Sequence, residues 1–358
     1  MKKSRFPTLI SAPMLLIGLL SPAELVRAAP PAQTGNFDCA AVDEIPQAEC
    51  EALAAFYRGT NGDSWRNHKG WLAKATPCHW DGIICDQGHV TELRLNTNKL
   101  EGSTPPELGQ LTWLKYLEVR DNHLSSSIPP ELGRLTRMEH LDLSDNRLTG
   151  PIPAELGQLT KLKYLDLRDN QLSGPIPPEL GQLTELAYLD LSFNGQLNGS
   201  IPPELSKMTG LERLYLIGNQ LSGPIPPELS KLTKLVDLDL SRNRLSGNIP
   251  PELSELTMLQ NLSLLDNELS GPVPTSLINL KFLSGIDVEA NPHLCMAEDD
   301  KFQAWLRRVA SFSGLALCSP ARLPQTGSET SAIAPAAALI LAGLALLVLG
   351  AGMRRVWA

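Results

Sequence analysis

The sequence lacks an excess of basic residues. Of its 358 residues, 31 are Lys or Arg and 39 are Asp or Glu, which gives a formal net charge of −8. A nucleic-acid partner requires clustered Lys and Arg side chains to neutralise phosphates. The composition therefore argues against nucleic acid and favours a basic partner, or solubility alone.

The sequence also has few residues in patterns that support catalysis. It contains no phosphate-binding glycine loop and no spacing typical of a nucleophile with its base. Of its six histidines, only His140 falls on the face described below. Repeated carboxylates could raise a pKa or hold Ca²⁺, but a flat strand face lacks a closed pocket. We therefore expect no enzyme, no cofactor and no metal.

Cysteine is absent from the centre of the chain, and all six cysteines lie near its ends. Their number does not fix their connectivity, but proximity suggests three local disulfides. The suggested pairs are Cys39 with Cys50, Cys78 with Cys85, and Cys295 with Cys318. A zinc site at Cys78, His79 and Cys85 is an alternative, although no Cys-x-x-Cys spacing supports it.

The centre of the chain is occupied by a repeated unit, with one copy at residues 162–185. Each copy opens Leu-x-x-Leu-x-Leu-x-x-Asn and continues Leu-x-Gly-x-Ile-Pro. Its Asn recurs every 24 residues from Asn98 to Asn291, with one step of 25 where Gly195 is inserted. A fixed period in this range indicates a solenoid. The Leu-x-Leu alternation predicts one short parallel strand per copy, with leucines inward and Asn satisfying backbone groups at the bend.

This unit resembles the leucine-rich repeat, and its Leu-x-Gly-x-Ile-Pro segment resembles the plant-type subclass. The resemblance implies an α/β solenoid, a superhelix of about nine repeats with parallel strands on its concave face. We place the array at residues 89–292.

Disulfide-bearing caps are expected at both ends of the array, because the terminal repeats expose apolar edges. Residues 29–88 contain a helical pattern from Pro46 to Gly59 and a cluster of Trp side chains that favours a lid over a ligand site. The segment ending at Cys85 resembles the amino-terminal cap of plant-type leucine-rich repeat proteins. Residues 293–318 contain a second helical pattern with one apolar face. That face comprises Phe302, Trp305, Leu306 and Val309.

The two termini indicate export. Residues 1–28 have the basic start, apolar run and small cleavage residues of a signal peptide, with an uncleaved anchor as the alternative. Near the other end, residues 319–331 form a linker that contains a short motif at 323–327. A transmembrane segment at 332–353 and a cytoplasmic tail at 354–358 are expected to follow it. The motif residues are Leu323, Pro324, Gln325, Thr326 and Gly327.

This tail resembles the cell-wall sorting signal of Gram-positive-type bacteria. The resemblance implies that a sortase-type transpeptidase cuts between Thr326 and Gly327 and joins Thr326 to the cell wall. An ordinary single-pass membrane anchor is the alternative.

The outward strand positions are where a ligand would bind, since the scaffold does not explain their side chains. Two adjacent columns carry an aromatic and an acidic series, and a few apolar residues depart from the internal pattern. These side chains are either generic fillers of the repeat or a binding surface. The aromatic series is Tyr116, His140, Tyr164 and Tyr188; the acidic series includes Asp142, Asp166 and Asp190; the departures are Phe193, Tyr215, Ile217 and Leu265.

The sequence as a whole predicts a surface-anchored protein that binds a protein or glycan ligand through its concave face. A surface spacer without a specific ligand is one alternative. An inhibitor of a secreted enzyme is another, suggested by the likeness to plant-type proteins that bind polysaccharide-degrading enzymes.

Overall fold

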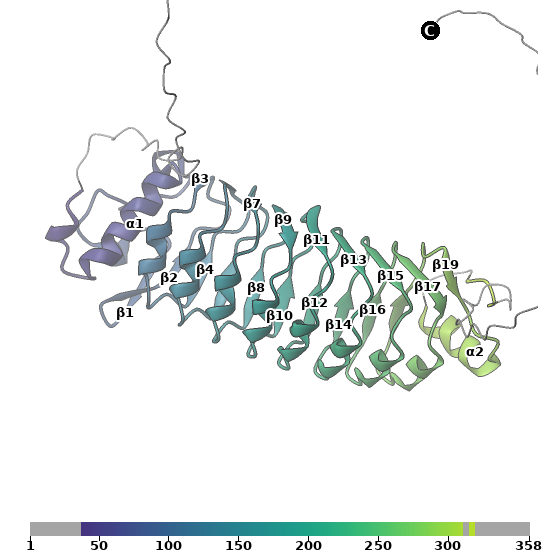
Figure 1. Ribbon diagram of the computed structural model, residues 1–358. Coiled ribbons are helices and arrows are strands. Elements are labelled where there is room, and N and C mark those ends of the chain that lie inside the picture. The colour runs from purple at the N-terminus through teal and green to yellow at the C-terminus, as the bar shows by residue number, and fades with distance from the viewer. Residues whose placement is uncertain (1–36, 311–314, 319–358) are drawn as a thin grey trace, which may run out of the picture.

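The computed structural model describes residues 37–310 and 315–318 of the chain. These residues form one elongated stack of repeats, with α1 at the amino-terminal end and α2 at the other (Figure 1). The predicted signal peptide, sorting motif, membrane span and tail lie outside the described residues. Within the described part, no helix has the length and apolar character needed to cross a membrane.

The concave face is a ten-stranded sheet, and from β4 onward each repeat contributes a three-residue strand to it. Strand β1 pairs with β2 in antiparallel fashion, and every later pair is parallel with its leucines in register. The strands, in sheet order, are β1 (Ile83–Asp86), β2 (His89–Arg94), β4 (Tyr116–Glu118), β6 (His140–Asp142), β8 (Tyr164–Asp166), β10 (Tyr188–Asp190), β12 (Arg213–Tyr215), β14 (Asp237–Asp239), β16 (Asn261–Ser263) and β18 (Gly285–Asp287).

Further short strands run along a second side of the stack, formed by the segment after each Asn. One pair is β3 (Glu101–Ser103) with β5 (His123–Ser125). A seven-stranded sheet comprises β7 (Thr149–Gly150), β9 (Gln171–Pro175), β11 (Gln196–Gly199), β13 (Gln220–Gly223), β15 (Arg244–Gly247), β17 (Glu268–Pro272) and β19 (His293–Cys295).

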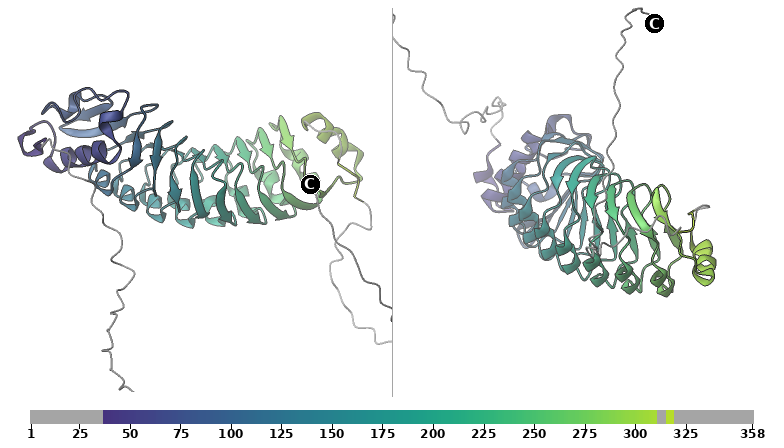
Figure 2. Two further views of the ribbon diagram at one scale, coloured as in Figure 1. Left: turned by 90° about the horizontal axis from the view of Figure 1, so that it is seen from above. Right: turned by 45° about the vertical axis from the view of Figure 1, so that its right-hand side comes forward.

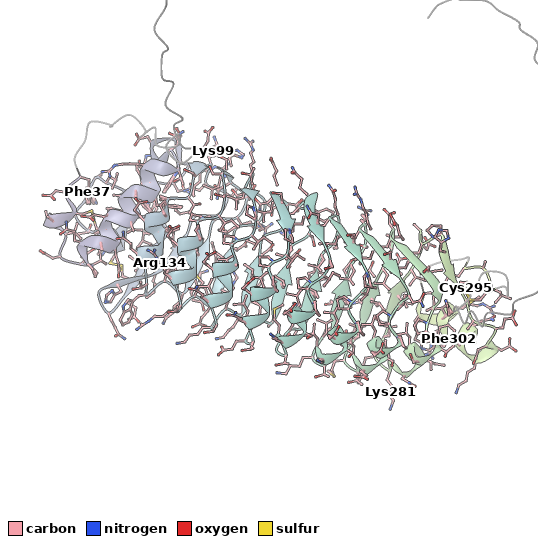
Figure 3. The ribbon with its side chains drawn as sticks, viewed as in Figure 1. Phe37, Lys99, Arg134, Lys281, Cys295 and Phe302 are labelled. Carbon is pink, nitrogen blue, oxygen red and sulfur yellow. A yellow bond between two sulfur atoms is a disulfide. The ribbon has the colours of Figure 1, made fainter. Side chains whose placement is uncertain are left out.

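A 3₁₀ helix follows in each repeat, and these helices stack along the side away from the concave sheet (Figure 2). Proline begins most of them, because its fixed φ suits the first helical position and its missing N–H is not needed there. Arg134 at the end of one helix marks this side in Figure 3. The helices are η5 (Pro106–Gln110), η6 (Pro130–Arg134), η7 (Ala154–Gln158), η8 (Pro178–Gln182), η9 (Pro203–Lys207), η10 (Pro227–Lys231), η11 (Pro251–Glu255) and η12 (Thr275–Asn279).

The core is a continuous row of leucines, which confirms the predicted inward positions. In one repeat Leu165, Leu167, Leu172, Leu180 and Leu183 are all fully buried. Burying each such side chain contributes roughly 1.5–3 kcal/mol relative to leaving it exposed. The apolar core therefore runs the length of the array without a break.

The recurrent asparagine links each repeat to its neighbour, as predicted. The Asn170 side-chain amide donates to the carbonyls of Leu143 and Leu167 at 3.0 and 3.2 Å, and its oxygen accepts from the Leu148 amide. Within the described residues, no buried side-chain nitrogen or oxygen lacks a hydrogen-bond partner. The Asn side chain thus pairs backbone groups of two successive repeats, which would cost folding free energy if they were left buried without a partner.

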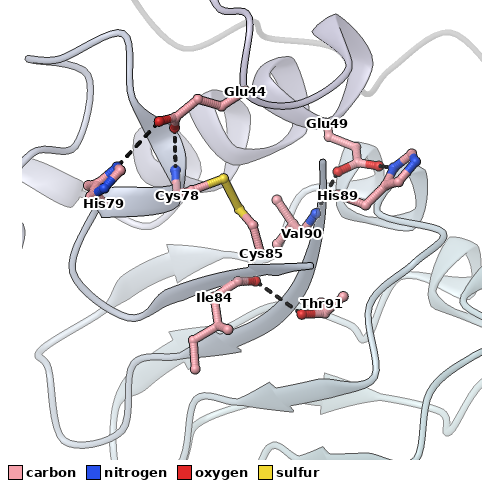
Figure 4. Close-up of a disulfide and its surroundings, with 9 residues drawn as sticks. All are labelled: Glu44, Glu49, Cys78, His79, Ile84, Cys85, His89, Val90 and Thr91. Atoms are coloured by element: carbon pink, nitrogen blue, oxygen red, sulfur yellow. Dashed lines mark hydrogen bonds and ion pairs between the residues drawn. A yellow bond between two sulfur atoms is a disulfide. The ribbon is translucent and has the colours of Figure 1, made fainter. Parts of the chain in front are cut away.

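The amino-terminal cap covers the first repeat with a helix and a Trp cluster. It consists of η2 (Cys39–Ala41), α1 (Gln47–Gly59), η3 (Gly62–Ser64), η4 (Pro77–His79) and β1. The rings of Trp65, Trp71 and Trp80 are buried and pack edge-on or tilted. The buried Glu49 carboxylate accepts from the Val90 amide and contacts His89, which fastens the helix to the first strand of the array (Figure 4).

All three suggested disulfides are present in the structure. Cys39 bonds to Cys50, Cys78 to Cys85 (Figure 4), and Cys295 to Cys318. The zinc alternative is therefore wrong, because both sulfurs that it needs form a disulfide. His79 instead lies 3.3 Å from the Glu44 carboxylate.

The carboxy-terminal cap is α2 (Asp300–Val309), which packs against the last repeat. Asp299 caps its first turn by accepting from the Phe302 amide at 2.8 Å, as a short acidic side chain does at this position. The four predicted apolar residues, Phe302, Trp305, Leu306 and Val309, are the buried face of this helix. Phe302 and Cys295 mark this end of the molecule in Figure 3.

Candidate binding face

The aromatic side chains of the concave face form one continuous stack across five strands. The rings of His140 and Tyr164 are 4.2 Å apart and nearly parallel, and those of Tyr164 and Tyr188 are 4.4 Å apart. Tyr116 stacks on His140 at one end, and the edge of Tyr215 meets Tyr188 at the other. We call these five residues the aromatic stack. The parallel register makes the stack of the first four rings, because it places equivalent side chains about 4.8 Å apart. Tyr215 joins them from the neighbouring column, since it is in register with Asp190.

The acidic series lies beneath this stack rather than on the open surface. Asp142, Asp166 and Asp190 are 8%, 1% and 5% exposed. The hydroxyls of Tyr164 and Tyr188 donate to the carboxylates of Asp166 and Asp190 at 3.1 and 3.2 Å. The prediction of an exposed acidic ridge is therefore wrong for these three residues. Tyr164 and Tyr188 fold over Asp166 and Asp190, whereas Asp142 accepts from the hydroxyl and the amide of Ser144.

Burial changes the ionisation of this half of the face. Desolvation raises the pKa of Asp166 to about 7; a hydrogen bond from the Arg168 amide opposes the rise, and the charges of Asp190 and Asp142 add to it. Desolvation also raises the pKa of Tyr215 to about 12 and lowers the pKa of His140. The rings and the carboxylates of this half of the face thus pack against one another, which suits a structural role.

The apolar departures form a local group at β10 and β12. Phe193 is 42% exposed, and Tyr215 and Ile217 are half-buried. A Cβ atom on Gly218 would lie only 2.7 Å from the Phe193 ring, so the ring lies over this glycine. Leu265 is half-buried and belongs to the repeat of β16, separated from β12 by β14. The structure therefore joins Phe193 to the repeat of Ile217, since the Phe193 amide donates to the Ile217 carbonyl at 2.7 Å, whereas Tyr215 packs on Tyr188.

A hollow of about 410 Å³ opens on the concave face over β12, β14, β16 and β18. Tyr215 closes it on the side of the aromatic stack. We call it the hollow. Its other lining residues are Asp237, Leu238, Asp239, Asn261, Leu262, Ser263, Gly285, Ile286 and Asp287.

The hollow exists because one column of side chains becomes smaller along the array. Tyr188 occupies the first outward position of β10, whereas Asp237, Asn261 and Gly285 occupy the same register in β14, β16 and β18. Without large rings, the strands themselves form the floor. The decrease in side-chain volume along this column is visible in the sequence, although the chemical character of the same residues does not indicate it.

The lining of the hollow is acidic. The Asp237 carboxylate is engaged by Arg213 at 3.2 Å and by the Tyr215 hydroxyl at 3.3 Å. Asp239 and Asp287 each accept a hydrogen bond from the backbone amide two residues on. Among the described residues, neither of these two carboxylates has a salt bridge.

Two exposed apolar side chains belong to the turns that lead into β16 and β18, two strands that line the hollow. Met258 and Phe282 are 46% and 60% exposed, and each precedes a lining residue, Asn261 or Gly285, by three positions. We call this pair the apolar rim. The equivalent position is charged in four other repeats, at Arg137, Lys161, Glu185 and Lys234. Sequence reasoning missed the pair because this column lies before the strand.

The groups that the hollow presents are those of a polar surface with one aromatic edge. No group of three or more His, Cys, Asp or Glu side chains in the described residues is suited to a metal ion. The hollow presents carboxylates, amide and hydroxyl groups and one aromatic edge. Such a surface can select a ligand by charge and shape.

Comparison with known families agrees with this geometry. The family described as "Leucine-rich repeat region" matches residues 89–216 and 153–331, and "Leucine rich repeat N-terminal domain" matches 46–86. The chain belongs to the leucine-rich repeat family. A further family, "LPXTG cell wall anchor motif", matches residues 319–355. This leucine-rich repeat chain is thus a cell-surface protein with a wall-anchor motif.

Similar proteins come from plants and place the array in the plant-type subclass. The probable inactive receptor kinase RLK902 of Arabidopsis thaliana is 39% identical over 75 residues, which is 20% of this chain and 11% of that protein. The receptor kinase HAESA of Arabidopsis, solved with the peptide hormone IDA and the co-receptor SERK1, has a TM-score of 0.61 and 32% identity. The match covers 70% of this chain and 42% of the HAESA chain.

A plant ice-binding protein is similar over its whole length. It has a TM-score of 0.56 and 26% identity, and the match covers 78% of this chain and 100% of that chain. This chain therefore spans only part of the receptor relatives but all of a smaller plant protein. The shared feature is the solenoid itself.

Proposed function

We propose that this protein is a non-catalytic surface receptor or adhesin that binds a protein or glycan ligand in the hollow of its concave face. One observation carries the proposal: the face is filled by stacked rings over β4–β10 but open over β12–β18, with a cavity of about 410 Å³. That volume lies within the range of ~300–1,000 Å³ found for ligand pockets. A spacer has no need of such a change along its length.

The comparisons support binding as the role of the array. The HAESA ectodomain is solved with a peptide hormone and a co-receptor, and this chain has the same type of solenoid. The stacked aromatic half gives the face rigidity, because each ring packs on the next. The same rigidity would present the neighbouring hollow in one fixed shape.

We further propose a role for each segment on either side of the array. Residues 1–28 direct export, 29–88 and 293–318 cap the repeats at 89–292, and 319–331 link them to the 332–353 span and the 354–358 tail. A sortase-type transpeptidase then cuts at Thr326–Gly327 and joins the protein to the cell wall. The match to a wall-anchor family over 319–355 supports this order of events.

Filling the hollow tests the proposal. The substitution Asn261→Tyr places in β16 the side chain that β8 and β10 carry at the same register, so the fold accommodates it. Cells displaying the full-length protein are screened with a glycan array and with a library of short random peptides. We expect the ligands selected by the native protein to lose binding to Asn261→Tyr.

The matched control is Gln171→Tyr, which adds the same ring on the exposed side of β9, away from the hollow. It should bind as the native protein does. Ligands that bind Asn261→Tyr unchanged would refute the hollow as the site. Failure to select any ligand from either library would favour the spacer.

A further inference from the structure

We infer that the ligand is an extended protein segment that places a basic side chain in the hollow and an apolar side chain on the apolar rim. This inference rests on the proposed function and specifies its partner. It combines two neighbouring features, an acidic hollow and a pair of exposed apolar side chains.

The charge of the hollow selects a cation. Three carboxylates line it, and the only salt bridge that the described residues make there joins Asp237 to Arg213. Asp239 and Asp287 thus retain negative charge that a guanidinium or ammonium group can offset. The Tyr215 ring at the boundary adds a surface on which such a cation can lie.

The apolar rim selects a hydrocarbon side chain next to that cation. Met258 and Phe282 occupy equivalent positions in successive repeats, so they lie side by side along the array. Exposed large apolar side chains in a cluster mark contact sites, and Met adapts its shape to a partner. A ligand that covers these two side chains removes apolar surface from water, which contributes favourable free energy to binding.

The distance between the two features fits an extended chain. Phe282 precedes Gly285 on the floor of the hollow by three residues, so their Cα atoms are at most about 11 Å apart. Side chains two or three positions apart in an extended peptide span a similar distance at ~3.3 Å per residue. One short segment can therefore fill both places.

A neutral glycan matches this surface less well. Its hydroxyl groups can bond to Asn261, Ser263 and the carboxylates, but they supply no positive charge. It also supplies no aliphatic side chain to cover Met258 and Phe282. A basic and apolar protein segment supplies both, so we assign the site to a protein.

A library of short random peptides, applied to cells that display the full-length protein, tests the assignment. We expect the selected peptides to share Arg or Lys with an apolar residue two or three positions away. Replacing that Arg or Lys by Gln in a selected peptide should weaken binding by roughly tenfold. The same change should have little effect on the variant Asp239→Asn with Asp287→Asn, because the charge it contacts is already gone.

Matched variants separate the two features. Met258→Ser with Phe282→Ser should weaken binding of the selected peptides, whereas Ile84→Ser, an equally exposed apolar residue in the amino-terminal cap, should not. Glu155→Gln with Glu179→Gln removes two exposed carboxylates from the 3₁₀-helix side and should leave binding unchanged.

Three results would overturn the inference. The first is that the selected peptides contain no basic residue, and the second is that their binding does not respond to the Asp239 and Asp287 changes. The third is that ligands are selected only from the glycan array. If such ligands are still lost in Asn261→Tyr, the hollow remains the binding site and only the partner is wrong. If they bind Asn261→Tyr normally, the proposed function fails as well.

Discussion

Single polar side chains decide how the concave face behaves, because burying a charge costs free energy unless the charge is offset. Asp166 is 1% exposed, accepts from the Arg168 amide at 3.0 Å and lies in register with Asp142 and Asp190 on the adjacent strands. Three carboxylates in such a row repel one another. The protonation of Asp166, which lies under the aromatic stack, is therefore linked to the stability of the folded protein.

Stability should fall as the pH rises through the range in which Asp166 titrates. Its pKa is about 7 in the folded protein against an ordinary 3.8, so the folded state binds the proton more tightly between these values. The stability that this tighter proton binding contributes to the folded protein is fully present below about pH 4 and is lost by about pH 7. The variant Asp166→Asn keeps an acceptor for the Arg168 amide and should be more stable than the native protein at pH 8, with a smaller gain at pH 5.

Urea denaturation at both pH values measures this. The exposed Asp266→Asn serves as the control and should show a similar, small effect at both. An equal gain from Asp166→Asn at pH 5 and pH 8 would contradict the assignment.

Phe193 and Gly218 form a pair that departs from the repeat together. Phe193 has a φ of 55°, a region unfavourable for a bulky residue, and Asp169 occupies the equivalent position one repeat earlier. Gly218→Asp should destabilise the protein by about 1–3 kcal/mol, because its Cβ would meet the Phe193 ring. Combining it with Phe193→Asp should recover on the order of 1 kcal/mol.

A double-mutant cycle of unfolding free energies measures that coupling. Strictly additive effects would show that the ring and the glycine are independent. Gly195→Ala is a suitable reference, since a Cβ there meets no atom within 4 Å.

Elements of a solenoid depend mainly on their neighbours, so each cap protects the repeats nearest to it. Helix α2 covers the last repeat with a face that includes Phe302 and Trp305. Its short length and amphipathic pattern suit a lid rather than an independent helix.

Trp305→Ala should therefore destabilise the carboxy-terminal repeats locally. The buried ring is 7% exposed, and its loss should cost about 3–5 kcal/mol at that end. Hydrogen exchange, read peptide by peptide, should show faster exchange in β16–β19 and unchanged protection in β4–β8. Uniformly faster exchange along the array would mean that the repeats unfold as one unit.

The sequence predicted most of these elements for physical reasons that are local. Leu-x-Leu alternation fixes strand and inward face, and the recurrent Asn fixes the bend. The sequence did not predict contacts between different columns of side chains. Tyr188 contacts Tyr215, which belongs to another column, and Tyr188 also folds over the aspartate two residues on. The hollow and the apolar rim were also missed, because they depend on side-chain volume and on positions outside the strand.

The whole molecule combines a leucine-rich repeat array with a wall-anchor motif a short distance beyond it. Thr326 follows Cys318, the end of the described cap, by eight residues. Even fully extended, eight residues reach at most about 29 Å. The carboxy-terminal repeats, which contain the hollow, therefore stay near the point of attachment.

Thr326→Ala should release the protein from the cell-wall fraction, because the transpeptidase would lose the residue that it joins to the wall. Fractionation followed by immunoblotting of cell wall, membrane and medium measures this. Gln325→Ala, at the variable position of the motif, should leave anchoring intact. Persistence of Thr326→Ala in the wall fraction would exclude sorting at this motif.

The disulfide between Cys295 and Cys318 gives the anchored protein a mechanical property. If a ligand in the hollow is pulled away from the wall, tension enters the folded body at Cys318 and crosses the sulfur bridge directly to Cys295 at the end of β19. The segment between the two cysteines, which contains α2, then bears no load, and neither do the repeats before β12. Reduction of this one bond would route the same tension through the segment that contains α2.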